Sequence, residues 1–154
     1  MNKDRKRIVI ALGGNALKLP QQKGTFGEQF ANVRAASHHI LEFIQHGFEV
    51  VITHGNGPQV GNLLVQQEAG SSQVPAQPLE ICSAMTQGQL GYMLQQALMN
   101  ELKSHSLNLN VATMITQVLV DREDPDFAHP SKPVGLFYDR RTKEKLEAER
   151  GYQM

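Results

Sequence analysis

Short apolar runs recur along this chain, separated by longer stretches in which apolar residues return with helical spacing. Residues 7–12 and 48–53 are nearly continuous apolar runs, a pattern typical of strands buried in a parallel sheet. Residues 111–115 begin a further run, which we expect to continue to about residue 120. The chain is therefore predicted to contribute three strands to one sheet.

Helical patterns fill the intervals between these runs. Residues 27–46 carry apolar side chains at helical spacing, and Gly47 is placed to end that helix as its C-cap. Further helices are predicted over residues 57–69 and 79–104, and an exposed one, with charges three and four apart, begins near Arg140. Strands that alternate with helices predict the α/β class, with a parallel sheet and helices on both faces.

The second predicted strand leads through a glycine-rich turn directly into a helix. Gly55, Asn56 and Gly57 occupy this turn. Glycine lets the backbone approach a ligand closely and can adopt a positive φ, and the free N–H groups of a helix start attract anions. A plain connection does not need so many glycines, so the turn favours a site for a small anion.

The first predicted strand ends in a similar turn, formed by Gly13, Gly14 and Asn15. Taken alone, this turn is more often simply a tight connection. Ligands of open parallel sheets bind beyond the carboxyl ends of the strands, however. The two turns are therefore predicted to form two walls of one site.

Residues 121–138 differ from the rest of the chain. They contain Pro125, Pro130 and Pro133 together with several charged residues. Prolines at these positions exclude a continuous helix or a central strand. Because the stretch is longer than an ordinary connection, we expect a lid or another functional loop.

Composition narrows the class of protein. The 154 residues carry no net charge, so nothing favours nucleic acid or an anionic membrane as a partner. No apolar run approaches the roughly 18 residues of a membrane span. The basic residues 1–7 are not followed by the apolar stretch of a signal peptide, so the cytoplasm is expected. Cys82 is a lone cysteine with apolar neighbours, predicted to be buried, and no metal-ligand spacing is found.

Several segments, taken in order, resemble the motifs of a known family. With these motifs the chain resembles the N-terminal half of the carbamate kinases, within the amino acid kinase family. The segments are residues 9–16 (VIALGGNA), 54–62 (HGNGPQVGN), 84–92 (AMTQGQLGY), 116–121 (TQVLVD) and 130–135 (PSKPVG).

The resemblance implies a fold and a division into domains. The fold is an α/β three-layer sandwich with a mainly parallel sheet. Residues 1–120 would form a carbamate-side domain, 121–138 a protruding lid-like subdomain, and 139–154 the start of a connection to a C-terminal nucleotide-binding domain. Carbamate kinases continue into that second half, so we expect this chain to be a truncated product that is inactive alone.

The activity implied is reversible phosphoryl transfer from ATP to carbamate, giving ADP and carbamoyl phosphate. Mg²⁺ would accompany the nucleotide. The resemblance also implies a role in arginine metabolism and a homodimer to which helix 79–104 contributes. Without the resemblance, Lys132 would be interpreted as an ordinary solvated side chain. The implied site residues are Gly13, Gly14 and Asn15 around the transferring group, Gly55, Asn56 and Gly57 around carbamate, and Lys132 as the catalytic lysine.

Two other functions remain open at this point. The chain could be a catalytically inactive fragment that only dimerises or binds a small anion. It could also belong to a different amino acid kinase, such as one that acts on glutamate or acetylglutamate. The turn over residues 54–61 and the PSKP segment favour carbamate over those substrates.

Overall fold

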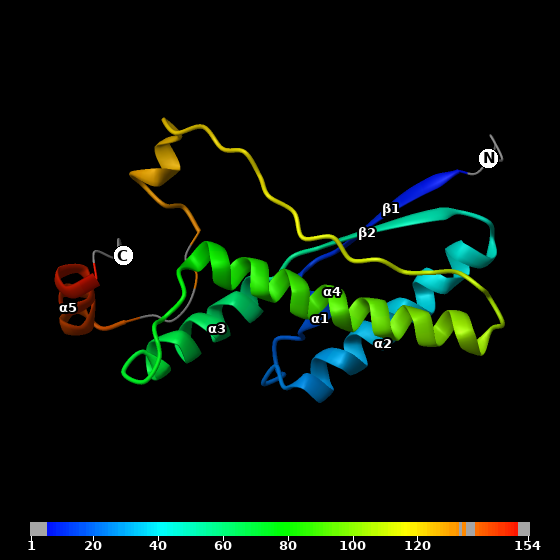
Figure 1. The fold of residues 1–154 in the computed structure, drawn as a ribbon, viewed down its shortest axis with the longest axis horizontal. Coiled ribbons are helices and arrows are strands. Elements are labelled where there is room, and N and C mark those ends of the chain that lie inside the picture. The colour runs from blue at the N-terminus through cyan, green and yellow to red at the C-terminus, as the bar shows by residue number, and fades with distance from the viewer. Residues whose placement is uncertain (1–5, 133, 135–137, 151–154) are drawn as a thin grey trace.

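The computed structural model describes residues 6–132, 134 and 138–150. Strands and helices alternate through the first part of the chain, and a long extended segment leads to the last helix (Figure 1). In order, the elements are β1 (Arg7–Leu12), α1 (Gly14–Leu17), α2 (Phe26–Gln45), β2 (Glu49–His54), α3 (Gly57–Gly70), α4 (Leu79–Ser104), the 3-10 turn η1 (Pro125–Phe127) and α5 (Arg140–Arg150).

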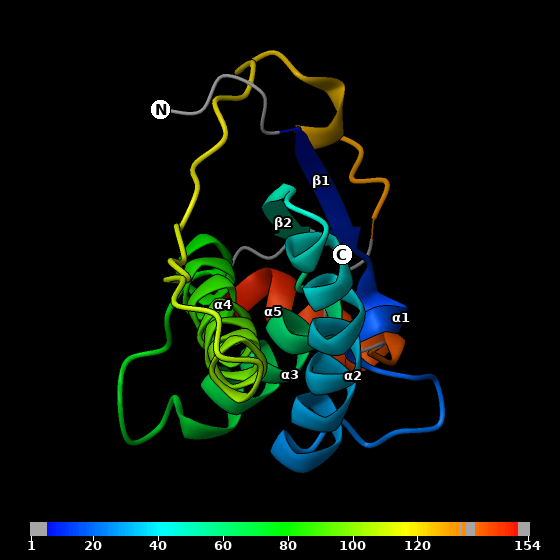
Figure 2. The ribbon, with the colours of Figure 1, turned by 90° about the vertical axis from the view of Figure 1, so that its right-hand side faces the viewer.

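The sheet described consists of β1 and β2, which pair in parallel. Helices α2, α3 and α4 lie on one side of it (Figure 2). Alternate side chains of both strands face these helices, whereas Val9 and Val51, on the other face, are 63% and 43% exposed. The α/β class with a parallel sheet is confirmed. The part of the chain that the structure describes supplies the sheet and the helices of one face.

The hydrophobic core lies between α2, α4 and the inner face of the sheet. Val33 and Ile40 of α2 pack in one cluster with Leu90 and Leu94 of α4. Cys82 is fully buried, as the sequence predicts, and burial raises the pKa of its thiol, with a smaller contribution from Glu80. The predicted functional site is therefore supported by a packed pair of helices, α2 and α4.

The ends of α2 show why the sequence forms this helix. Thr25 and Glu28 form a capping box, and the hydrogen bonds from Thr25 hold the pKa of the Glu28 carboxyl below its usual value. At the other end Gly47 has φ of +84°, and the N–H of Phe48 donates to the carbonyl of Phe43 at 3.1 Å. This pattern is a Schellman motif, so the predicted role of Gly47 is confirmed.

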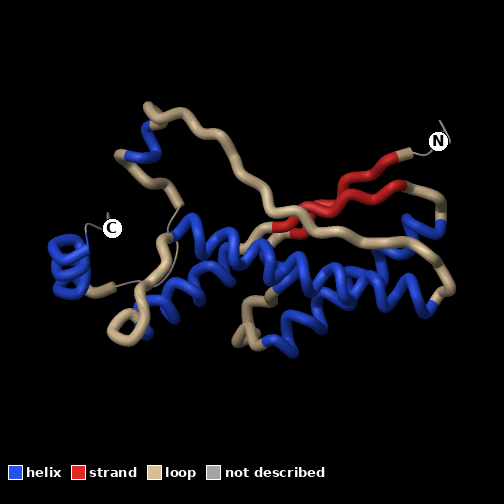
Figure 3. The backbone as a smooth tube through the Cα atoms, in the orientation of Figure 1, coloured by secondary structure: helices blue, strands red, loops and turns tan. Residues whose placement is uncertain are grey.

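The prediction of a strand over residues 111–120 is wrong, because in the part of the chain that the structure describes these residues form no strand. These residues form an unpaired loop, which first runs along α4 and then leaves it toward η1 (Figure 3). Their hydrogen bonds join them to α4, mostly to its side chains. The N–H of Thr116 donates to Gln87 Oε1, and Gln95 Nε2 donates to the carbonyl of Val111, both at 2.9 Å. A strand needs a neighbouring strand for its ladder, and apolar composition cannot supply one.

Ser106 closes α4 in a conformation that suits glycine better than serine. Its φ is +58°, and the N–H of Leu107 donates to the carbonyl of Leu102 at 2.9 Å. A left-handed residue with a Cβ costs about 1–2 kcal/mol. Ser106→Gly should therefore raise the midpoint of thermal unfolding by about 3 °C, measured by circular dichroism. Ser104→Gly, at the last residue of α4, should lower it; stabilisation by both changes would refute this explanation.

Candidate functional site

The two glycine turns lie side by side at one edge of the sheet. Leu12 is opposite His54 in the parallel register, so both turns leave the sheet at the same end. The N–H of Gly55 donates to the carbonyl of Leu12 at 3.2 Å and extends the ladder into the second turn. A Cβ added to Gly14 would lie 4.0 Å from Cδ of Pro58. The starts of α1 and α3 are thus neighbours, as two walls of one site require.

The turn glycines leave their backbone accessible. A Cβ added to Gly13, Gly55 or Gly57 would meet nothing within 4 Å. The expectation of a positive φ at these turns is wrong, because the described glycines with positive φ are Gly24 and Gly47. The glycines of the turns therefore contribute open space above the backbone rather than an unusual conformation.

Asn56 connects the second turn to α4. It is the N-cap residue of α3, yet its side chain does not cap that helix. Its Nδ2 instead donates to Thr86 Oγ1 at 2.8 Å and to the carbonyl of Ser83 at 3.0 Å. Within the described residues, the N–H of Gly57, at the first position of α3, has no hydrogen-bond partner and remains a donor for an anion. Asn15 lies in α1, and its side chain is outside what the structure describes.

Thr86 is a contributor to this site that the sequence analysis missed. It occupies the inner face of α4, in register with Cys82 and Leu90, where its neighbours along the helix are apolar. A hydroxyl on the buried stripe of a helix was the available signal, because such a group needs partners in the core. Its position in the AMTQGQ segment places that segment behind the second glycine turn.

In the part of the chain that the structure describes, no hydrogen bond or ion pair joins Lys132 to the glycine turns. It is exposed, and no hydrogen bond or ion pair joins it to the described residues. The stretch around it is anchored at its far end, where the hydroxyl of Tyr138 donates to Glu68 of α3 at 2.7 Å. Pro133 and Gly135, which complete the predicted motif, lie outside the described residues. The catalytic role of Lys132 stays a prediction.

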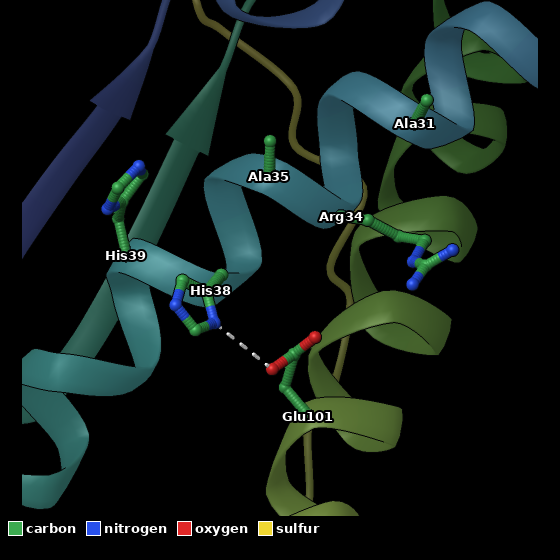
Figure 4. Close-up of a pocket in the computed structure, with 6 residues that line it drawn as sticks. All are labelled: Ala31, Arg34, Ala35, His38, His39 and Glu101. Atoms are coloured by element: carbon green, nitrogen blue, oxygen red, sulfur yellow. Dashed lines mark ion pairs between the residues drawn. The ribbon is translucent and has the colours of Figure 1, made fainter.

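A hollow lies between α2 and α4, away from the glycine turns. Arg34, His38 and His39 line it from α2 and Glu101 from α4 (Figure 4). His38 Nδ1 lies 3.5 Å from Glu101 Oε2. Across the described ranges, no three side chains of His, Cys, Asp or Glu gather as metal ligands do. In those same ranges, no helix is both long and apolar enough to cross a bilayer.

Residues 6–150 match the profile of the amino acid kinase family, so the chain belongs to that family. Within it, the chain is similar to carbamate kinases. The carbamate kinase of Pyrococcus horikoshii is 54% identical over 149 residues, which cover 96% of this chain and 48% of that protein. The carbamate kinase of Trichomonas vaginalis is 48% identical over the same coverage. The chain spans about half the length of the curated relatives it matches.

Solved structures agree with these relatives. The carbamate kinase of Giardia lamblia bound to AMP-PNP aligns with a TM-score of 0.91 at 40% identity, over 98% of this chain and 48% of that one. The same enzyme bound to citric acid aligns with a TM-score of 0.83 over 96% of this chain. The likeness covers the sheet, the helices and both glycine turns, since it spans nearly the whole chain.

Proposed function

We propose that this chain is the carbamate-binding half of a carbamate kinase, which transfers a phosphoryl group reversibly between ATP and carbamate. One observation carries the proposal: the two Gly-Asn turns adjoin at the carboxyl ends of parallel strands, in a chain 54% identical to a carbamate kinase. Open backbone at two adjacent turns suits a ligand that is small and anionic.

In this proposal the chain positions the reactants and stabilises charge. Carbamate is already an anion, so no general base is needed. The free N–H of Gly57 at the start of α3 would bind its oxygens. The turn at Gly13 and Gly14 would stabilise the transferring phosphoryl group, whose charge spreads over its oxygens in the transition state. Asn15 would belong to the same wall, and Lys132 would add a positive charge.

ATP or ADP is the proposed second reactant. The Giardia lamblia enzyme was determined with AMP-PNP bound, and we assign the nucleotide and its Mg²⁺ mainly to the half of the relatives that this chain does not match. We also propose a cytoplasmic homodimer acting in arginine metabolism. Met85 and Tyr92 support a contribution of α4 to the dimer, because both are exposed apolar side chains on it.

A second candidate is a fragment that binds an anion or a protein partner without catalysis. The exposed apolar side chains of residues 111–120 favour an interaction role, because monomers rarely expose so much apolar surface. These side chains are Met114, Ile115, Val118, Leu119 and Val120. Both candidate functions are consistent with further polypeptide that packs against these side chains and against Val9 and Val51.

The two candidates are separated by supplying the second half. Residues 1–150 joined to the second half of the Pyrococcus horikoshii enzyme should form ATP from ADP and carbamoyl phosphate, whereas the 154-residue chain should not. The reason is that both reactants must be held in line, and a misplacement of about 1 Å can cost 10²-fold in rate. Activity of the unassisted chain near that of the chimera would refute this division of labour. A folded chimera that instead uses acetylglutamate or glutamate would indicate a different amino acid kinase.

A further inference from the structure

Behind the second glycine turn, α4 carries a buried polar residue within an apolar stripe. Thr86 is 1% exposed. Its hydroxyl oxygen lies 3.0 Å from the carbonyl oxygens of both Cys82 and Ser83, either of which can accept the hydroxyl hydrogen. The hydroxyl oxygen in turn accepts from Asn56 Nδ2 at 2.8 Å. The hydroxyl thus both donates and accepts a hydrogen bond, and its partner outside α4 is Asn56 of the glycine turn.

Asn56 directs its side chain at α4 rather than at its own helix. Asparagine is among the strongest N-cap residues, because its oxygen normally accepts from the first N–H groups of the helix. Here φ is −139° and ψ is 14°, and no side-chain cap forms. The two amide hydrogens are divided between Thr86 and Ser83. Because Pro58 has no N–H, a side-chain cap from Asn56 would bind the N–H of Gln59, and this interaction is replaced by a link to the core.

This replacement has two consequences for the turn. The N–H groups of Gly57 and Gln59 have no partner among the described residues and stay free for a ligand, and the orientation of the turn is fixed relative to α4. We infer that Thr86 is a positioning residue for the anion-binding turn, acting through Asn56. The inference rests on the proposed function, because it explains how the carbamate-binding donors are held. It also gives a role to the AMTQGQ segment, which the proposed chemistry leaves unused.

The inference is tested first on the 154-residue chain, without any ligand. In Thr86→Val the shape of the side chain is kept and the acceptor is lost. Hydrogen exchange of the Val60 amide, whose N–H donates to the Asn56 carbonyl at 2.9 Å, should then accelerate about tenfold, as expected for the loss of one hydrogen bond. The Gly57 amide resonance should shift, while exchange in α2, for example at Ile40, stays unchanged. Thr86→Ser should restore both signals.

Ser37 supplies a matched control. It is a fully buried hydroxyl that donates only to the carbonyl of Val33 within α2, at 2.9 Å. Ser37→Ala should change stability without moving the signals of Val60 or Gly57. A mutant cycle with Asn56→Ala completes the test, because a residue that acts through Asn56 adds nothing once Asn56 is gone. If Thr86→Val does not fold, Thr86→Ala and Asn56→Ala are compared with Thr86→Ser in the same way.

A kinetic measurement distinguishes positioning from simple packing. In the chimera with the second half of the Pyrococcus horikoshii enzyme, Thr86→Val should raise KM for carbamoyl phosphate about tenfold and leave KM for ADP unchanged. If the exchange rate of the Val60 amide and the Gly57 resonance in Thr86→Val match those of the wild type, the inference is overturned and the proposed function remains intact. An inactive wild-type chimera would instead contradict the proposed function, and the exchange experiment would still decide the role of Thr86.

Discussion

Valine in place of Gly55 should abolish phosphoryl transfer in the full-length chimera while the protein remains folded. The space above Gly55 is open, since an added Cβ meets nothing within 4 Å, and the residue does not have a positive φ. The substitution therefore has little to disturb within the chain. It does fill the space beside Gly14 and Gly57 in which the ligand is proposed to bind, so we expect kcat/KM to fall by at least about 10²-fold.

Gly47→Ala is the matched control, and the opposite result is expected for it. Gly47 has φ of +84° and also faces open space. Alanine there should cost about 1–2 kcal/mol of folding free energy and leave the activity of each folded molecule unchanged. Thermal unfolding and turnover, measured on both variants and on Gly14→Val, give the comparison. Parallel losses of folded protein and of activity at Gly55 would return this glycine to a structural role.

Much of this fold could be predicted because its elements are specified locally. The periodicity of residues 79–104 gives α4 with its observed ends, and the apolar run at 7–12 gives β1. Gly47 predicts the end of α2, because a Schellman motif is formed by residues adjacent in sequence. The adjacency of the two turns also followed from sequence, since parallel strands place their carboxyl ends at one edge.

What depends on distant partners could not be predicted. The run at 111–120 has strand composition, but whether it pairs depends on a neighbour that its own residues do not specify. Asn56 illustrates the same limit within the site. An asparagine at the start of a helix usually caps it with its side chain, whereas the amide of Asn56 donates to Thr86, 30 residues away. Choosing between accepting from the N–H groups of α3 and donating to α4 requires knowing that α4 packs behind the turn.

Alanine in place of Lys132 should lower kcat of the same chimera by about 10²–10³-fold, the usual effect of removing one electrostatic contact to a transition state. Lys132 is exposed and bonded to none of the described residues. Its loss should therefore not change the midpoint of thermal unfolding. Before Lys132 the loop is held by local bonds, for example from Ser131 Oγ to Asp126 Oδ2 at 3.1 Å, and beyond it Tyr138 bonds to Glu68 of α3. We accordingly expect this loop to become ordered when carbamoyl phosphate binds.

Lys132→Arg should restore only part of the lost turnover. Arginine keeps the charge but spreads it over a planar fork, whereas lysine presents a compact ammonium group. Lys145→Ala, at another exposed lysine on α5, is the control and should leave kcat unchanged. Steady-state kinetics at saturating ADP and carbamoyl phosphate give the three values. Wild-type turnover in Lys132→Ala would assign Lys132 to the solvated lysines, and carbamate recognition would then rest on the two glycine turns and on the Asn56–Thr86 link that holds one of them.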